Sequence, residues 1–306
     1  MKIDTGKIEI ADGSRISYRT TGDMNKTKIM LVSGSIFNYQ QFETVLFPAL
    51  KSRLKGDYCY IQYDYVGIGE SSQLNGEFEF LKIADQHLEF MDALGIENAH
   101  HFGYSKGSII SFFAAMKSQK RALSVASYGS PNLAYVGDGT TRNEFMKRLE
   151  YLNSISGIWG NLIDSKNFRV FYDTVFLPTI FEGKQAQNLG IFDNIKSWWI
   201  RKKIEPFLTG TLIHNLVKLY QLYIEEITEG DRQKYIDTLK EITIPTLLLH
   251  SEFDEIVPVQ GARELSTYLQ NNKMIEYNKF SHSSPVLRKK EGKRIMTDYS
   301  NFILSL

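Results

Sequence analysis

Hydrophobic and polar positions follow two different periods along the first part of the chain. KIEIAD (7–12) and RISYRTT (15–21) alternate apolar and polar residues, with the turn sequence DGS between them, which predicts a β-hairpin. KIMLVSG (28–34) and YCYIQYD (58–64) are apolar runs that end in polar or glycine residues. Such runs are typical of strands that are covered on both faces of a parallel sheet.

Helix-like segments separate these predicted strands. NYQQFETVLFPALKSRL (38–54) and FEFLKIADQHLEFMDALG (78–95) carry apolar residues at three- and four-residue spacings, and the second ends in a glycine that can cap a helix. AHHFGY (99–104) and ALSVASYG (122–129) predict two more strands, with a helix between them. Strands that alternate with crossover helices predict an α/β fold with a mostly parallel central sheet.

The alternation stops near residue 131 and resumes near residue 241. The stretch between them has no strand pattern, and it holds helix-like segments and all three tryptophans. These aromatic residues either form a small core of their own or line an apolar pocket. We therefore predict an α/β core made of residues 1–131 and 241–306, with residues 132–240 inserted as a helical cap.

Charge and composition exclude several functions. Lys and Arg number 36 against 35 Asp and Glu, so the net charge of +1 provides no field that attracts nucleic acid. The only cysteine, Cys59, lies in an apolar run and is predicted to be a core residue. The sequence shows neither the apolar h-region of a signal peptide nor an 18-residue apolar run. We expect a cytoplasmic protein without stable membrane insertion, and no metal or cofactor.

One serine is flanked by glycines at a predicted strand-to-helix junction. In the order Gly103-Tyr104-Ser105-Lys106-Gly107, the serine follows AHHFGY and opens a helical pattern. Glycine is unfavourable inside strands and helices, so this pair indicates a turn too tight for other side chains. A strand-turn-helix of this kind exposes the serine hydroxyl at the carboxyl edge of the sheet. Ser105 is therefore the candidate nucleophile.

Two further residues complete a catalytic set. A serine hydroxyl needs a base to remove its proton, and the base needs a carboxylate to fix its tautomer. Asp254 lies just beyond the predicted strand TLLLHS, and His282 follows KMIEYNKF by two residues. The chain order is Ser, Asp, His, with each residue past the end of its own strand. We predict His282 as the base and Asp254 as the carboxylate that orients it.

Taken together, the motifs point to a known superfamily. The chain resembles the α/β-hydrolase fold superfamily of the serine-nucleophile type over nearly its whole length. The segments that carry the resemblance are VSGS (32–35), DYVGIGESS (64–72), GYSKG (103–107), HSEFDEIVP (250–258) and FSHSSP (280–285).

The resemblance implies an oxyanion hole as well as the fold. In such enzymes two backbone N–H groups bind the oxyanion, and the matching residues here are Lys106 and Ser35. Two positions depart from the usual pattern: Ser33-Gly34 stands where His-Gly is common, and Ser281 where Gly precedes the histidine. Both departures leave the backbone donors in place. The role of the Lys106 side chain stays open.

Three functions remain compatible with the sequence. The first is a hydrolase that cleaves a carboxylic ester or thioester with an apolar acyl group, free or carrier-bound, through an acyl-serine intermediate. The second is an acyltransferase that passes the acyl group to an alcohol or amine. VSGSIFNYQQF, EFDE and PNLAYVGDG favour this alternative, because they are similar to the acyltransferases that join hydroxyacyl chains in rhamnolipid assembly. The third is a non-catalytic binding protein on the same fold. The oligomeric state is not predicted.

Two polar residues near these motifs have structural interpretations. Asp64 precedes Gly67 and Gly69, and we predict that its carboxylate caps a turn instead of acting in catalysis. His250 lies four residues before Asp254, close enough to support the acid loop.

Overall fold

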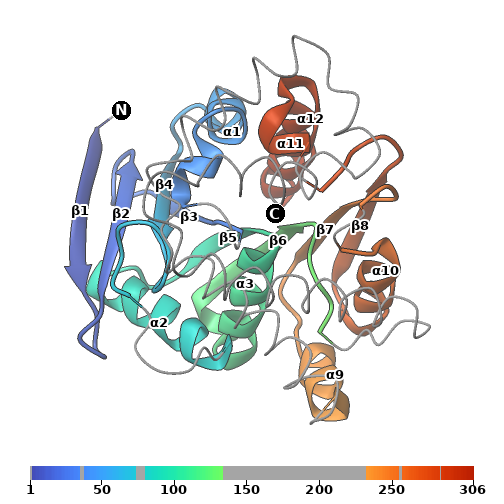
Figure 1. The fold of residues 1–306 in the computed structure, drawn as a ribbon, viewed down its shortest axis with the longest axis horizontal. Coiled ribbons are helices and arrows are strands. Elements are labelled where there is room, and N and C mark those ends of the chain that lie inside the picture. The colour runs from blue at the N-terminus through green and yellow to red at the C-terminus, as the bar shows by residue number, and fades with distance from the viewer. Residues whose placement is uncertain (1, 35–37, 74–79, 134–231, 255–256, 283) are drawn as a thin grey trace, which may run out of the picture.

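The computed structural model describes residues 2–34, 38–73, 80–133, 232–254, 257–282 and 284–306. These residues form an eight-stranded sheet in the order β1-β2-β4-β3-β5-β6-β7-β8 (Figure 1). The strands are β1 (Ile3–Glu9), β2 (Arg15–Thr21), β3 (Thr27–Val32), β4 (Tyr58–Asp64), β5 (Ala99–Tyr104), β6 (Ala122–Tyr128), β7 (Thr246–Ser251) and β8 (Asn272–Tyr277).

Strand pairing confirms the predicted hairpin and the mostly parallel sheet. β1 pairs with β2, and β2 with β4, in antiparallel fashion, whereas the strands from β4 through β8 in the sheet order pair in parallel. Tyr104 at the end of β5 pairs with Tyr128 at the end of β6, and Ser251 of β7 pairs with Tyr277 of β8. The carboxyl ends of these four strands therefore lie along one edge of the sheet.

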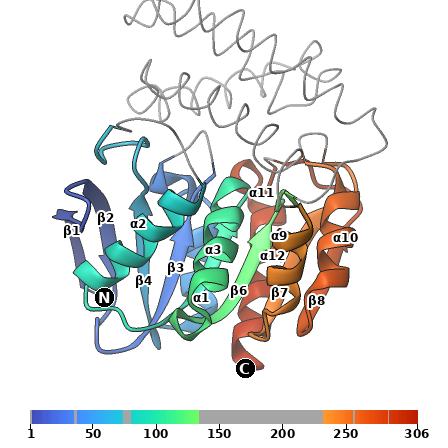
Figure 2. The ribbon, with the colours of Figure 1, turned by 90° about the horizontal axis from the view of Figure 1, so that it is seen from below.

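Helices cover both faces of the sheet (Figures 1 and 2). α1 and α12 pack together on one face, where they share an apolar cluster with β3, β5 and β6. α2 and α3 pack together on the other, and α3, α9 and α10 share a second cluster with β6 and β7. The helices are η1 (Tyr39–Phe42), α1 (Leu46–Leu54), α2 (Phe80–Ala93), α3 (Lys106–Lys117), η2 (Gln119–Arg121), α9 (Arg232–Lys240), α10 (Val259–Tyr268), α11 (Ser284–Leu287) and α12 (Lys289–Leu304).

The single helix suggested by the pattern of residues 38–54 is divided in two. Asn38 caps the short helix η1, with its side chain accepting the N–H of Gln40. α1 then begins at Leu46, which places Pro48 in its first turn. Proline lacks an N–H and clashes with the preceding turn inside a helix, so it is tolerated in the first turn only. The apolar spacing continues through both helices, but the proline makes the α-helix begin later.

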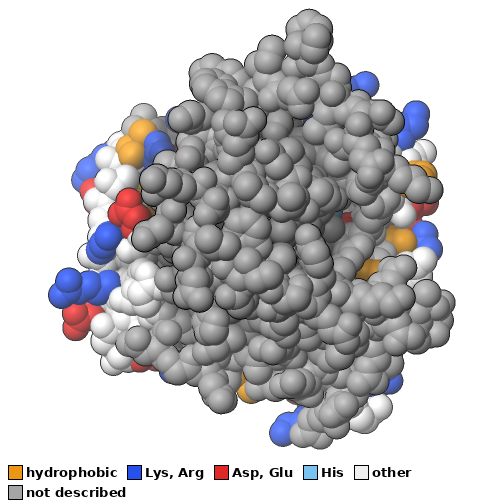
Figure 3. Space-filling model, in the orientation of Figure 1, with side chains coloured by type: hydrophobic (Ala, Val, Ile, Leu, Met, Phe, Trp, Pro, Cys, Tyr) orange, Lys and Arg blue, Asp and Glu red, His pale blue; other side chains and the backbone are white. Residues whose placement is uncertain are grey.

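The predicted cap lies mostly outside the described residues. Only its first two positions and α9 at its end are described, and Leu239 of α9 is buried against the core with Ile242. The cap boundaries stay a prediction. On the visible rim of the described part in Figure 3, basic and acidic side chains are interspersed. Within the described ranges, no helix is long and apolar enough to cross a membrane.

A chain of buried polar side chains connects β4, α2 and β5. Tyr63 Oη contacts His87 Nδ1, and His87 Nε2 lies 3.1 Å from His101 Nδ1. His101 Nε2 lies 3.3 Å from the carbonyl of Arg121, which can only accept. His101 must therefore carry its proton on Nε2 and accept from His87, which in turn accepts from Tyr63. Each imidazole is neutral and fixed in one tautomer.

We expect stability to fall on mild acidification. Burial lowers the folded-state pKa of His100 and of His101 from 6.5 to about 4, and that of His87 well below its ordinary value. Between pH 6.5 and pH 4 these histidines are protonated in the unfolded chain and neutral in the folded chain. Each histidine should lower the free energy of unfolding by up to about 1.4 kcal/mol per pH unit as the pH falls from 6.5.

Asp64 opposes one of the three histidines. Burial raises its pKa from 3.8 to about 7, against the two N–H groups that lower it, so the folded chain takes up a proton there first. The net proton uptake on unfolding from His87, His100, His101 and Asp64 should therefore rise to about two near pH 5, and the buried His250, whose pKa burial also lowers, adds to it; urea titrations between pH 7 and pH 5 measure the sum. His100→Asn, which keeps a partner for Ser124, should reduce this slope by one proton. Stability that rises on acidification in this range would contradict the assignment.

Candidate active site

Ser105 lies on a strained turn between β5 and α3. Its φ is 52° and its ψ is −121°, whereas Lys55, the other described non-glycine residue with a positive φ, has the ordinary left-handed ψ of 26°. Such a conformation costs about 1–3 kcal/mol and persists only where the surroundings impose it. The N–H of Ser105 donates to the carbonyl of Tyr128 (2.8 Å), which ties the turn to β6.

Both flanking glycines are required by close backbone approach. A Cβ at Gly103 would lie 2.4 Å from the backbone of Ser108, and one at Gly107 would lie 2.1 Å from the carbonyl oxygen of Val32. Neither obstacle is a flexible side chain, so neither can move aside. The strand, the turn and the helix therefore cross more closely than any other residue type allows, as the sequence predicted.

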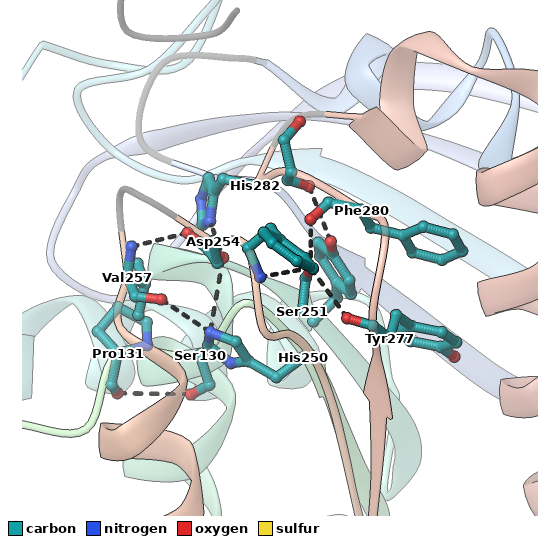
Figure 4. A network of polar contacts seen from close by, with 12 residues as sticks. Ser130, Pro131, His250, Ser251, Asp254, Val257, Tyr277, Phe280 and His282 are labelled. Carbon is teal, nitrogen blue, oxygen red and sulfur yellow. Dashed lines mark hydrogen bonds and ion pairs between the residues drawn. The ribbon is translucent and has the colours of Figure 1, made fainter. Parts of the chain in front are cut away.

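Asp254 and His282 form a buried pair at the same edge of the sheet (Figure 4). His282 Nδ1 lies 2.6 Å from Asp254 Oδ2, and the N–H of Val257 donates to Oδ1 (2.8 Å). Burial alone would raise the pKa of Asp254, but the charge and hydrogen bond of His282 and the other nearby donors together lower it. The carboxylate therefore stays ionised and accepts the Nδ1–H of the imidazole.

His250 supports the loop that carries Asp254. Its Nε2 donates to the carbonyl of Val257 (2.8 Å) and lies 3.5 Å from Asp254 Oδ2 (Figure 4). Burial lowers the pKa of this imidazole, so it is neutral and holds the turn through its hydrogen bond. This fits the support suggested by its position four residues before Asp254.

Residues beside Ser105 contact the histidine. The ring of Tyr104 meets the His282 ring edge-on, with centroids 5.9 Å apart and planes at 74°. Gly129, next to the Tyr128 that binds the Ser105 N–H, lies against His282 and Asp254. The three predicted residues therefore come from the ends of separate strands to one place at the sheet edge.

The predicted oxyanion hole is described in part. Lys106 is the first residue of α3, and its buried Nζ lies 4.5 Å from the centre of the Tyr65 ring. Burial lowers the pKa of this amine well below its ordinary value. Ser35 lies outside the described residues.

Gly34, the last described residue before Ser35, is held from both sides. Its N–H donates to Gln41 Oε1 (2.9 Å), and its carbonyl accepts from Tyr65 Oη (3.1 Å). A Cβ built at Gly34 would lie 3.5 Å from the Cβ of Ser105, so this backbone passes directly beside the serine. Sequence reasoning did not anticipate Gln41 or Tyr65 in this role.

Asp64 caps two turns, as predicted. Its Oδ1 accepts the N–H of Tyr39 (2.7 Å), and its Oδ2 accepts the N–H of Glu70 (3.2 Å). Among the residues that the structure describes, no group of three or more His, Cys, Asp or Glu side chains is placed to hold a metal ion.

Comparisons with known proteins agree with this architecture. Residues 29–155 match the family described as alpha/beta hydrolase fold. A crystal structure of the enol-lactonase from Burkholderia xenovorans superposes with a TM-score of 0.70 at 18% identity, covering 98% of this chain and 100% of that one. The chain has the α/β-hydrolase fold. The fold predicted from the motifs is confirmed.

Sequence relatives of the chain include named enzymes. A bifunctional esterase/perhydrolase of Acinetobacter calcoaceticus is 22% identical, over 98% of this chain and 100% of its own. A non-heme chloroperoxidase of Burkholderia pyrrocinia is 28% identical, over 90% of this chain and 92% of its own. These relatives support an enzyme on the α/β-hydrolase fold.

Gly129 is the position where one added methyl group should disturb the imidazole of His282. Its φ is 61°, and a Cβ there would lie 2.8 Å from His282 Cε1. Gly129→Ala should therefore displace His282 and lower turnover by about tenfold or more. Gly95→Ala is the matched control, because its φ is 67° and nothing lies within 4 Å of the added carbon.

Backbone strain alone would affect both variants equally. The free energy of unfolding should fall in both variants by at least the about 1–2 kcal/mol that a left-handed alanine costs, whereas activity per folded molecule should fall only in Gly129→Ala. Equal activity of the two variants would contradict the contact between Gly129 and His282.

Proposed function

We propose that this protein is a serine hydrolase that cleaves a carboxylic ester or thioester with an apolar acyl group. The strained backbone of Ser105, at the sheet edge that carries the Asp254–His282 pair, supports this proposal most strongly. A binding protein has no need of a strained serine beside an oriented imidazole. The related esterase/perhydrolase and the enol-lactonase neighbour are consistent with acyl chemistry on this fold.

The proposed reaction assigns one task to each side chain. Ser105 Oγ attacks the carbonyl carbon of the substrate while His282 Nε2 takes the serine proton. The imidazolium then gives that proton to the departing alcohol or thiol. Asp254 keeps the other imidazole proton on Nδ1 and stabilises the imidazolium. Water then attacks the acyl-serine by the same steps, which releases the carboxylic acid and restores Ser105.

The tetrahedral oxyanion needs donors that are fixed before the reaction. The backbone N–H of Lys106, in the first turn of α3, and that of Ser35 are the proposed donors. Gln41 and Tyr65 hold the backbone of Gly34, so they fix the chain that leads to Ser35.

Labelling with a fluorophosphonate probe tests the proposal. We expect a single adduct that maps to Ser105, because an activated serine attacks phosphorus as it attacks an acyl carbon. Prior heat denaturation should prevent the adduct, since the activation depends on the folded arrangement. Folded protein that gives no adduct at Ser105 would overturn the proposed function.

Product analysis separates hydrolysis from transfer. Acyl thioesters are supplied with and without alcohol or hydroxyacyl acceptors, and the products are identified by mass spectrometry. Hydrolysis predicts free acid in both samples. New ester in the presence of an acceptor would favour the acyltransferase alternative.

A further inference from the structure

Three consecutive carbonyl groups in the histidine loop each accept a hydrogen bond from a side-chain hydroxyl. Ser251 Oγ donates to the carbonyl of Phe280, Tyr128 Oη to that of Ser281 (2.9 Å), and Tyr104 Oη to that of His282. We name this set of three donors, Ser251, Tyr128 and Tyr104, the hydroxyl ladder.

The ladder follows the order of the strands. Ser251 is the last residue of β7, Tyr128 of β6 and Tyr104 of β5, and these three strands are neighbours in the sheet. The loop therefore crosses the carboxyl ends of three strands and is held at each of them in turn. Each of the three carbonyls is bound by a different strand end. The last of these donors, Tyr104, is followed directly by Ser105, so the ladder fixes the histidine loop relative to Ser105.

The two tyrosines act as donors at any ordinary pH. Both are buried, and burial raises the pKa of each phenol well above its usual range. A phenol that keeps its proton beside a carbonyl can only donate to it. Loss of the Tyr104 hydroxyl would leave the carbonyl of the buried His282 without that partner, which is costly. The part-buried carbonyl of Ser281 also accepts from the N–H and the Oγ of Ser284 (3.3 and 3.2 Å), and Tyr128 is the donor that ties it to β6.

Two other buried tyrosines provide a comparison for the ladder hydroxyls. Tyr60 and Tyr299 belong to the same apolar cluster as Tyr104 and Tyr128. Their hydroxyl groups have no hydrogen-bond partner among the described residues. The ladder hydroxyls differ because each is aimed at a carbonyl of one loop.

The acid loop is tied to the same strand end. Ser251 Oγ accepts the N–H of Phe253 (3.1 Å), one residue before Asp254, and its hydrogen also lies within reach of the Tyr277 carbonyl (3.1 Å) (Figure 4). One side chain thus contacts both the segment that carries the acid and the loop that carries the base.

We propose that Tyr104 and Tyr128 are positioning residues that hold the His282 backbone in register with Ser105 and Asp254. Their hydroxyl groups act through the loop and touch no reacting atom. The proposal rests on the proposed function, because it assigns to these residues the geometry that proton transfer to His282 requires. A base displaced by about 1 Å can cost a hundredfold in rate.

The test compares three Tyr→Phe variants. Tyr104→Phe and Tyr128→Phe remove one ladder hydroxyl each, and Tyr299→Phe removes a buried hydroxyl for which the described residues provide no partner. Circular dichroism first establishes folding, and because the two rungs are separate, either variant alone decides the test. The rate of fluorophosphonate labelling and the hydrolysis of p-nitrophenyl butyrate are then measured.

We expect the ladder variants to lose about tenfold to a hundredfold in labelling rate and in kcat, with KM changed less than about twofold. Tyr299→Phe should match the wild type. A folded ladder variant that labels and turns over at the wild-type rate would overturn the proposal. So would an equal loss in Tyr299→Phe.

A second readout does not depend on the proposed function. The proton in the short bond between His282 and Asp254 should resonate far downfield in the NMR spectrum, and Asp254→Asn identifies it by its loss. The ladder variants should broaden or shift this signal, whereas Tyr299→Phe should not. If wild-type protein is not labelled, the proposed function fails, and an unchanged signal in the ladder variants would separately refute the positioning role.

Discussion

Ser105→Ala should reduce turnover by about 10⁴- to 10⁶-fold and abolish fluorophosphonate labelling. Without the hydroxyl no acyl-enzyme can form, and the remaining rate would come only from substrate binding and the oxyanion donors. Steady-state hydrolysis of a p-nitrophenyl ester measures turnover, its burst phase measures formation of the acyl-enzyme, and intact-mass spectrometry measures labelling. Alanine at this position still has a positive φ, so stability should change little.

A matched serine in the helix that follows Ser105 controls for the loss of an oxygen. Ser111 in α3 is buried and donates to the carbonyl of Gly107 (2.9 Å), and it has no part in the proposed chemistry. Ser111→Ala should keep wild-type labelling and turnover. Appreciable activity in Ser105→Ala would contradict the assignment of the nucleophile.

Asp254→Asn should lower kcat by about 10⁴-fold and leave the fold intact. An asparagine is nearly isosteric, but its NH₂ group can donate to His282 Nδ1 and favour the tautomer that carries the proton on Nε2. That tautomer cannot take the proton of Ser105. The loss should appear in kcat and not in KM, because substrate binding does not involve this carboxylate.

Asp298→Asn provides the control for this second change. Asp298 on α12 accepts from Tyr277 Oη (2.8 Å) and takes no part in the proposed chemistry. Its neutral variant should retain full activity. Asp254→Asn with a turnover near that of the wild type would show that another group orients His282.

The periodicity of the sequence predicts much of the fold. Apolar runs that end in polar residues located the parallel strands, because a strand covered on both faces admits few polar side chains. The hairpin of β1 and β2 followed from the alternation on either side of DGS. The divided helix at residues 38–54 was missed, since an apolar spacing does not report where Pro48 permits an α-helix to begin.

The three candidate catalytic residues were also readable, because each follows a strand and parallel strands end at one edge. The contacts that hold them were less accessible. Tyr104, Tyr128 and Ser251 act through the carbonyls of a loop that is far away in the chain, and no residue pattern specifies such carbonyl partners. One signal was present: each of the three strands ends in a side chain that carries a hydroxyl group.

A trapped acyl-enzyme provides the most direct measurement of the central claim. Protein is mixed with short- and long-chain esters and thioesters, quenched in acid after milliseconds to seconds, and digested for mass spectrometry. The account predicts a mass increase equal to the acyl group on the peptide that contains Ser105, with faster decay when a suitable acceptor or more water reaches the site. Product formation with an unmodified Ser105 peptide at every time point, or with the acyl group on another residue, would contradict it.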